Sequence, residues 1–253
     1  WTVSAREIDL SDSARWVSAV AASLGADAGG AARYLAGMAT LPDGRILVVG
    51  GVDKNGSPLS SAELYDPIAN SWKNAASLLM PRYRHTTTLL KNGKVLVAGG
   101  FDGFVGLSEC EIYDPANDRW TVTGALSQAR HRHTATLVTT TGKVLIVGGM
   151  ASGIVSTAEL YDPAAGQWSG AGSPPNPRFD HSAVLLPDMA TVLIAGGVTD
   201  IFLGTPSNDA RKWIAGSWSS AGTMAQPHAQ ATATLMPTGK VVLAGGVKDA
   251  QGA

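Results

Sequence analysis

The sequence predicts an all-β fold built from repeated units of four short antiparallel strands, and three observations predict it. Glycine pairs recur at 50/51, 99/100, 148/149, 196/197 and 245/246, a step of 48 or 49 residues. Each pair ends an apolar run typical of a buried strand, as in KVLIVGG. After each of the first three pairs comes Tyr-Asp-Pro, with a tryptophan seven residues beyond the tyrosine, at Trp72, Trp120 and Trp168.

One repeat shows how the four strands follow each other. Strand a is HTATLVT (133–139), strand b KVLIVGG (143–149), strand c STAELYD (156–162) and strand d QWSGAG (167–172). Glycine-containing turns separate a from b, and Asp-Pro turns separate c from d, so each pair is a hairpin. A period near 50 residues with four short strands is typical of a β-propeller blade.

The recurring residues carry a family resemblance. Arg-x-x-His before strand a, Gly-Gly after strand b, and the Tyr and Trp of strands c and d resemble the kelch and galactose-oxidase propeller family over nearly the whole chain. The resemblance implies that strand a is innermost. The first residues of each strand a, RYLA (33–36), RYRH (82–85), RHRH (130–133), RFDH (178–181) and PHAQ (227–230), then surround the mouth of a central channel.

The two ends of the chain complement each other. Residues 7–16, EIDLSDSARW, match the c–d hairpin EIYDPANDRW (111–120), whereas residues 231–246 form only an a–b hairpin. We expect one propeller domain over residues 1–253 with five blades, the fifth shared by residues 1–20 and 228–253, which removes two exposed sheet edges. A longer parent protein with more blades would produce the same pattern.

Composition narrows the function classes. Nineteen basic and 20 acidic residues, with only 15% of residues charged, argue against nucleic-acid binding and membrane-surface binding. No apolar run reaches the roughly 20 residues of a membrane span. The one cysteine, Cys110, occupies an alanine position of sister repeats and is expected to be buried and unreactive. We expect a monomer without cofactor. The compartment is unknown, and an extracellular or cell-surface parent protein is compatible with the sequence.

Residues that recur in every repeat are expected to support the blade. Arg33, Arg82, Arg130 and Arg178 are expected to bond to the backbone or to the strand-c carboxylates, which are Glu7, Glu63, Glu111, Glu159 and Asp209. His85, His133 and His181 are expected to pack between blades, because one histidine per blade cannot approach a metal closely enough to form three bonds of about 2.0–2.1 Å. No metal site is predicted. In the fourth repeat Arg211 and Lys212 are expected in place of Tyr and Asp.

Residues that break the repeat are the candidates for a binding site. Arg84 and Arg132 stand in two adjacent repeats where Leu35 and Asp180 stand in others. The family resemblance implies an acidic peptide as ligand, because some kelch domains use an arginine here, and a guanidinium binds a carboxylate through two hydrogen bonds. A solvated rim arginine is the alternative. The full candidate set is Arg84, Arg132, Tyr34, Tyr83, His131, Asp180, Phe101, Phe104 and Phe202.

Three functions remain open. The first is a non-catalytic module that binds a protein or peptide through the mouth and the b–c loops. The second is an enzyme of the galactose-oxidase type, but the copper ligands implied by that resemblance do not transfer, since Cys110 is in an alanine-like position and no Tyr-His pair occurs. The third is a structural or glycan-binding domain of a surface protein, for which Trp213, expected at the c–d turn on the opposite face, is the one unusual aromatic residue.

Overall fold

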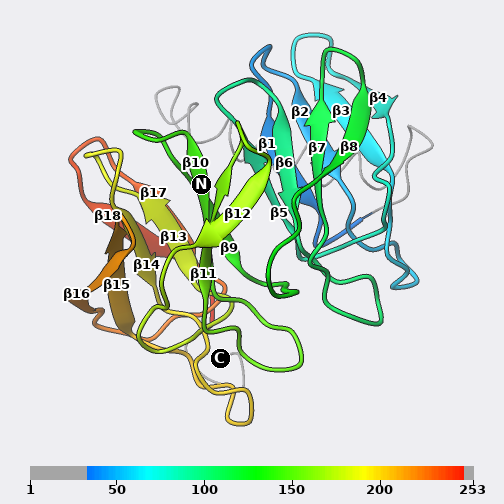
Figure 1. The fold of residues 1–253 in the computed structure, drawn as a ribbon. Helices are drawn as coiled ribbons and strands as arrows, with labels where there is room; N and C mark the ends of the chain where they lie inside the picture. The colour runs from blue at the N-terminus through cyan, green and yellow to red at the C-terminus, as the bar shows by residue number, and fades with distance from the viewer. Residues whose placement is uncertain (1–32, 248–253) are drawn as a thin grey trace, which may run out of the picture.

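The computed structural model describes residues 33–247, and in this range every element is a β-strand (Figure 1). The strands form four four-stranded antiparallel sheets and one two-stranded sheet, each in chain order. The first sheet contains β1 (Gly37–Thr40), β2 (Ile46–Val49), β3 (Ala62–Asp66) and β4 (Ser71–Ala75). The second contains β5 (Thr86–Leu89), β6 (Val95–Ala98), β7 (Cys110–Asp114) and β8 (Arg119–Thr123).

The remaining sheets repeat this order. The third contains β9 (Thr134–Val138), β10 (Lys143–Val147), β11 (Ala158–Asp162) and β12 (Gln167–Gly170). The fourth contains β13 (Ser182–Leu185), β14 (Val192–Ala195), β15 (Asp209–Ile214) and β16 (Ser217–Thr223). The fifth contains β17 (Thr232–Leu235) and β18 (Val241–Ala244). We call these sheets blades 1 to 5.

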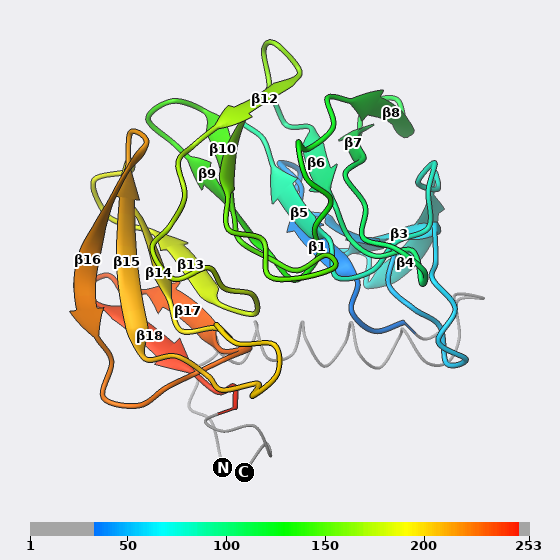
Figure 2. The same ribbon diagram turned by 60° about the horizontal axis from the view of Figure 1, so that its bottom comes forward.

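The blades are arranged around a common axis as a propeller. Strands β1, β5, β9, β13 and β17 are innermost, and each contacts the next one along the chain (Figure 2). Strands β4, β8, β12 and β16 lie on the outside (Figure 2). The predicted all-β propeller, its a-b-c-d strand order and the inner position of strand a are therefore confirmed.

Blade 5 is described only in part. Its strands β17 and β18 are present, whereas the predicted completion by residues 1–20 lies outside the described residues and stays a prediction. Strand β18 alternates between exposed and half-buried residues, whereas the equivalent β6 is buried at all four positions. A strand b is buried when a strand c pairs with it and a neighbouring blade covers each of its faces. The described part of blade 5 has no strand c beside β18.

Aromatic residues of strands c and d fill the space between blades. The rings of Tyr113 and Trp120 lie 5.0 Å apart, and both residues are buried. The indole N–H of Trp120 donates to the carbonyl of Ala76 in blade 1 at 2.8 Å. Trp168 makes the equivalent bond to Gly124 in blade 2 at 2.7 Å. Each tryptophan therefore joins its blade to the previous one through an apolar ring and a polar tip, as its recurrence predicts.

Blade 4 corrects one part of the sequence prediction. Trp213, expected at an unusual turn, lies within β15, pairs with Val192 and is buried. This is the register that Tyr161 occupies opposite Val144 in blade 3. The expected substitution of the tyrosine by Arg211 was wrong because the turn between β15 and β16 is two residues shorter than in blade 3: Trp213 pairs with Trp218, whereas Tyr161 pairs with Trp168. Trp213 replaces the strand-c tyrosine and no longer points to a glycan site.

The glycine pairs allow close approach between blades. Gly148 has a φ of 60°, and a Cβ there would lie 2.3 Å from the carbonyl oxygen of Arg178 in blade 4. The same oxygen accepts a hydrogen bond from the N–H of Gly149 at 2.9 Å. Gly50, Gly99 and Gly196 face the following blade in the same way, whereas no described atom lies within 4 Å of a Cβ at Gly245.

A glycine without a neighbouring backbone gives a matched control: Gly216, in the turn between β15 and β16, has a φ of 89° and no described atom within 4 Å of a Cβ. We expect Gly216→Ala to cost roughly 1–2 kcal/mol, the cost of a left-handed alanine alone. Gly148→Ala should cost roughly 3–5 kcal/mol, because a blade backbone must also move away. Urea unfolding of both variants measures the two free energies. Equal losses would show that the contact across blades 3 and 4 contributes nothing.

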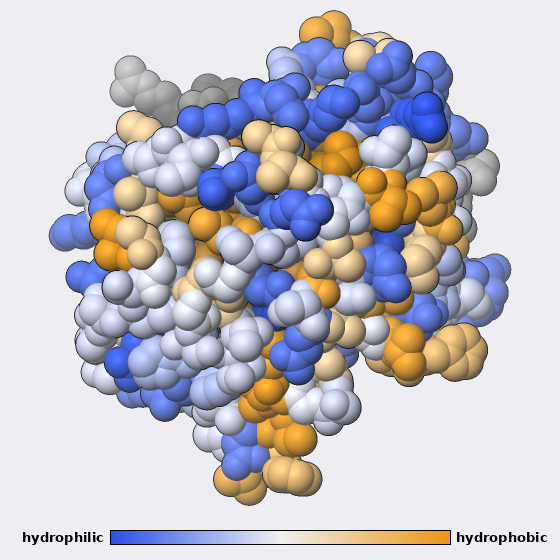
Figure 3. Space-filling model, viewed as in Figure 1, coloured by the Kyte–Doolittle hydropathy of each residue, from blue (hydrophilic) through white to orange (hydrophobic). Residues whose placement is uncertain are grey.

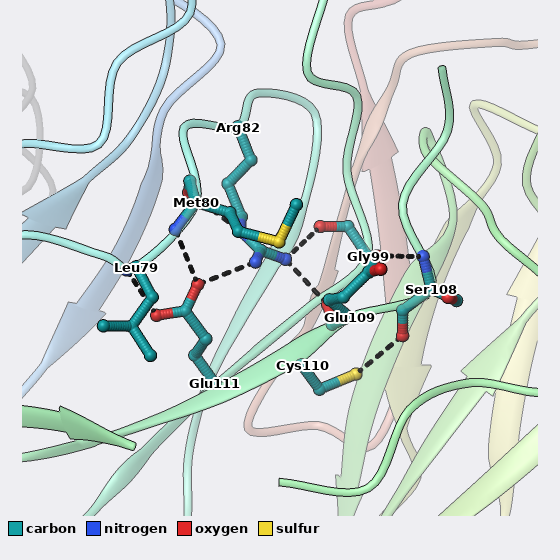
Figure 4. Close-up of polar contacts among 8 residues, drawn as sticks. All are labelled: Leu79, Met80, Arg82, Gly99, Ser108, Glu109, Cys110 and Glu111. Carbon is teal, nitrogen blue, oxygen red and sulfur yellow. Dashed lines mark hydrogen bonds and ion pairs between the residues drawn. The ribbon is translucent and has the colours of Figure 1, made fainter. Parts of the chain in front are cut away.

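A buried ion pair supports each of the first four blades, as Figure 4 shows for blade 2. Arg82 donates to Glu111 at 2.7 Å and to the carbonyls of Gly99 and Glu109 at 2.8 and 2.7 Å. Glu111 also accepts the N–H groups of Leu79 and Met80. The guanidinium therefore connects the start of strand a to the end of strand b and the start of strand c. The charges of Arg82 and Glu111 compensate each other.

The other ion pairs follow the same design. Arg33 bonds Glu63 at 2.9 Å, Arg130 bonds Glu159 at 2.5 Å, and Arg178 bonds Asp209. Arg211 occupies the register of the strand-c carboxylate in blade 4, and Asp209, two residues earlier, bonds Arg178 in its place. The predicted structural role of these arginines and carboxylates is confirmed in the described residues.

Cys110, which directly precedes Glu111 and is also drawn in Figure 4, is a structural residue too. It is fully buried, its thiol contacts the carbonyl of Ser108 at 3.5 Å, and burial raises its pKa to about 11. The predicted burial of this small residue is confirmed, and the raised pKa disfavours the reactive thiolate.

Candidate functional site

The mouth of the channel is formed by five residues in equivalent positions, which we call the collar. They are Leu35, Arg84, Arg132, Asp180 and Gln230. Each N–H from the second to the fifth donates to the carbonyl of the one before it, at 3.1, 3.1, 3.0 and 2.8 Å. These bonds join successive blades at the mouth.

The collar corrects the predicted alignment of the fifth repeat. His228, not Pro227, matches the frame arginines: its carbonyl accepts from Gly197, and its Nδ1 lies 3.2 Å from the carbonyl of Gly245. The equivalent segment is therefore 228–231, one residue later than expected. Gln230 stands at the Arg84 position, and Ala231 at the histidine position.

All five collar residues have a left-handed backbone, with φ between 53° and 58°. Such values are uncommon for residues other than glycine and often mark functional strain. Here the conformation recurs in every blade with four different kinds of side chain, so it belongs to the frame. The five blades therefore share the same backbone at the mouth and differ there only in the identity of the residue.

The two collar arginines, which stand at the same position of adjacent repeats, have different surroundings. Arg132 donates from Nε to Asp180 at 2.9 Å and from Nη2 to the second carboxylate oxygen. Its guanidinium also lies 4.8 Å from the ring centre of Phe179. Arg84 forms no ion pair with any carboxylate of residues 33–247, and its buried Nε has no hydrogen-bond partner there. The positive charge available at the mouth is therefore that of Arg84.

The aromatic candidates of the mouth are only partly accessible. Tyr83 contacts Phe101 edge-on with ring centres 5.6 Å apart, and Phe101 contacts His131 at 5.0 Å. His131 is buried, and burial is the main cause that lowers its pKa to about 4. Tyr34 is 55% exposed. Tyr83, Phe101 and His131 therefore pack against each other below the surface of the mouth. Tyr34 faces outward beside Leu35.

Two b–c loops carry exposed phenylalanines at their tips. Phe104 is 90% exposed and Phe202 is 92% exposed. Asp102 accepts the N–H groups of Phe104 and Val105 at 2.8 and 2.7 Å. Asp200 accepts those of Phe202 and Leu203 at 2.8 and 3.2 Å. An aspartate turn therefore holds each loop so that its apolar side chain points to solvent.

The space-filling view shows one of these loops as an apolar projection. Hydrophobic side chains gather at the lower edge of Figure 3, where Figure 1 shows the loop between β14 and β15. Ile201 and Leu203 beside Phe202 are also exposed. The apolar side chains of this loop therefore point away from their own blade.

The predicted histidine row lies below the collar. His133 and His181 accept or donate a bond through Nε2 to Thr86 and Thr134 of the preceding blade at 2.9 and 2.8 Å. At His85 the preceding blade has Gly37 in place of the threonine, and neither ring nitrogen has a partner among the described residues. The packing role is confirmed, with hydrogen bonds at two of three sites. No group of three or more potential metal ligands occurs within residues 33–247.

The opposite face differs from the mouth. A hollow of about 530 Å³ lies between the a–b turns of blades 1 and 2. Its charged residues are paired, Arg45 with Asp43 at 2.7 Å and Lys94 with Asp114 at 3.0 Å. At the mouth, by contrast, Arg84 has no carboxylate partner among residues 33–247, and its N–H bonds the carbonyl of Leu35, which follows the exposed Tyr34.

None of the described elements is a helix with the length and hydropathy to cross a membrane.

Five sheets around one axis, with arginine, glycine-pair and Tyr–Trp contacts repeated from blade to blade, define a kelch-repeat β-propeller. The sequence profile of the Attractin/LZTR1 beta-propeller family matches residues 27–202, more than half of the 253 residues. The chain belongs to this family.

Two further proteins are similar to the chain. The F-box/kelch-repeat protein At1g67480 of Arabidopsis thaliana is 42% identical over 62 residues, which are 24% of this chain and 16% of that protein. The match therefore spans well under two thirds of that relative. The structure of YjhT superimposes with a TM-score of 0.70 at 16% identity, over 86% of this chain and 78% of that one. At this identity the likeness concerns the fold.

Proposed function

We propose that the chain is a non-catalytic module that binds a protein or peptide with acidic character at the collar and the b–c loops. The single observation that carries the proposal is Arg84. The frame arginines and Arg132 are compensated by carboxylates, whereas Arg84 at the mouth has no carboxylate partner in the part of the chain that the structure describes. A ligand carboxylate would supply the two parallel hydrogen bonds that this group lacks.

The surroundings of Arg84 support a macromolecular ligand. Phe104 and Phe202 project from rigid turns, and exposed aromatic residues of this kind are typical anchors of protein interfaces. Exposed apolar groups on the same face as this cation suit a chain segment that combines an acidic side chain with apolar residues. Burial of the rings would contribute affinity, and the carboxylate would select the register.

The test is a selection of displayed peptides on the wild type and on Arg84→Asn. Asparagine suits the left-handed backbone at position 84, so the collar is kept while the charge is lost. We expect acidic motifs on the wild type and an affinity for them that falls roughly tenfold to a hundredfold in the variant. Arg119→Asn, on the exposed outer strand β8, is the control with the same charge change.

Two results would contradict the proposal. One is a wild type that enriches no motif, which would redirect work to metal analysis and glycan arrays. The other is a motif whose affinity changes equally in Arg84→Asn and Arg119→Asn, because a site at the mouth requires the first to be far more damaging.

A further inference from the structure

The two collar arginines differ because of one carboxylate. Asp180 receives both arms of the Arg132 guanidinium, and its second oxygen also accepts the side-chain amide of Gln230 at 2.9 Å. Phe179 covers the guanidinium from one face. A ligand carboxylate could take the two-armed Nε/Nη2 position of Arg132 only by displacing Asp180, so the charge on this side of the mouth is already compensated.

On the other side of the mouth, the residues that the structure describes are exposed and partly apolar. Arg84 is joined through its N–H to the carbonyl of Leu35 at 3.1 Å, and both Leu35 and Tyr34 are exposed. Burial lowers the pKa of Arg84, and the positive charge of Arg132 lowers it further, while Asp180 acts in the opposite direction. The two guanidiniums are thus near enough to interact, and Asp180 keeps the pair from presenting two free charges.

We propose that Asp180 determines the specificity of the mouth by neutralising Arg132, so that the collar accepts a ligand segment with one carboxylate, followed by an apolar residue on the Leu35 side, over segments with adjacent acidic residues. This inference rests on the proposed function. Asp180 acts through Arg132 and is a positioning residue. A second ligand carboxylate beside the first would meet the negative charge of Asp180 instead of a free guanidinium.

The experiment selects peptides from one displayed library on wild type, Asp180→Asn and Asp180→Glu. Asparagine suits the φ of 53° and removes the charge, whereas glutamate keeps the charge. We expect motifs with one acidic residue on the wild type and on Asp180→Glu, and motifs with two adjacent acidic residues on Asp180→Asn. For synthetic peptides with Asp-Asp or Asp-Asn at the motif, the affinity ratio should shift at least about tenfold toward Asp-Asp in Asp180→Asn.

A ligand-free measurement accompanies the selection. Phenylglyoxal modifies accessible arginines, and mass spectrometry reports each site. In the wild type Arg84 should react faster than Arg132, and in Asp180→Asn the rate at Arg132 should rise toward that of Arg84. A general loosening of the fold would also raise the rates at the buried Arg82 and Arg130, which serve as internal controls.

The outcomes separate the two proposals. Enrichment of motifs with the same number of acidic residues on all three proteins would overturn the role of Asp180 and leave the binding function intact. An unchanged rate at Arg132 in Asp180→Asn would also overturn that role. A wild type that enriches no peptide would overturn the binding function, and the specificity proposal with it.

Discussion

The free energy of unfolding is expected to fall steeply as the pH decreases from 6.5 to 5, because four buried histidines must stay neutral in the folded protein. Burial lowers the pKa of His85 and His181 to about 3 and that of His131 to about 4. It also holds the pKa of His133 well below its usual value. Unfolded histidines titrate near 6.5, so acid favours the unfolded chain.

The size of this effect follows from the shifts. The stability that comes from keeping these histidines neutral is fully present above about pH 6.5. It is lost as the pH falls from there toward the pKa values that the histidines have in the folded protein. At pH 5, His85, His131 and His181 should each cost about 2 kcal/mol, and His133 adds to the loss. The total is comparable with the stability of an ordinary domain, about 5–15 kcal/mol. We therefore expect cooperative acid unfolding near pH 5.

Urea unfolding at a series of pH values between 5 and 7 measures the effect. The slope of the unfolding free energy against pH counts the protons taken up, and about three to four are expected near pH 5.5. His85→Gln is the informative variant because neither nitrogen of His85 has a partner among the described residues. It should reduce the slope by about one proton. A wild-type slope below one proton would contradict the prediction.

Glu111→Gln is the second substitution with a large expected effect. It keeps the shape of the side chain but leaves the Arg82 guanidinium uncompensated in a fully buried site. Loss of one partner of a buried ion pair costs about 3–5 kcal/mol. The neutral amide also replaces a carboxylate that accepts the N–H groups of Leu79 and Met80. We expect the segment before strand a of blade 2 to lose its connection to strands b and c of the same blade.

The control is Asp43→Asn, which breaks the exposed pair between Asp43 and Arg45. Exposed pairs contribute about 0–1 kcal/mol, so this variant should unfold almost like the wild type. Chemical unfolding of the two variants at pH 7 gives the comparison. If Glu111→Gln cost no more than Asp43→Asn, the repeated buried ion pairs could not be what holds the strand connections together.

Much of the fold could be predicted because propeller contacts repeat with the chain period. Trp120 and Trp168 recur in phase because each must reach a carbonyl of the preceding blade. Prediction failed where the phase was disturbed. A shorter turn between β15 and β16 moved Trp213 into the tyrosine register, and a one-residue shift placed His228 at the arginine position. Neither change leaves a local pattern, because both depend on strand pairing.

The candidate site was predicted less completely. Position alone placed Arg84 and Arg132 together at the mouth, but their different states depend on contacts between blades. Residues 132 and 180 lie in different repeats, and only the ring brings Asp180 to Arg132. The left-handed backbone of the collar was also hidden, since leucine, arginine, aspartate and glutamine share no preference for a positive φ.

The sequence by itself determined the all-β propeller, the strand order, the buried Arg–Glu pairs and the face that carries the irregular residues. These follow from periodicity, because every blade must solve the same packing problem with the same residue types. The tertiary structure decided which arginine stays free, which phenylalanines point to solvent, and where the register shifts. Those properties depend on side chains from neighbouring blades, and their distances are set only when the blades pack around the axis.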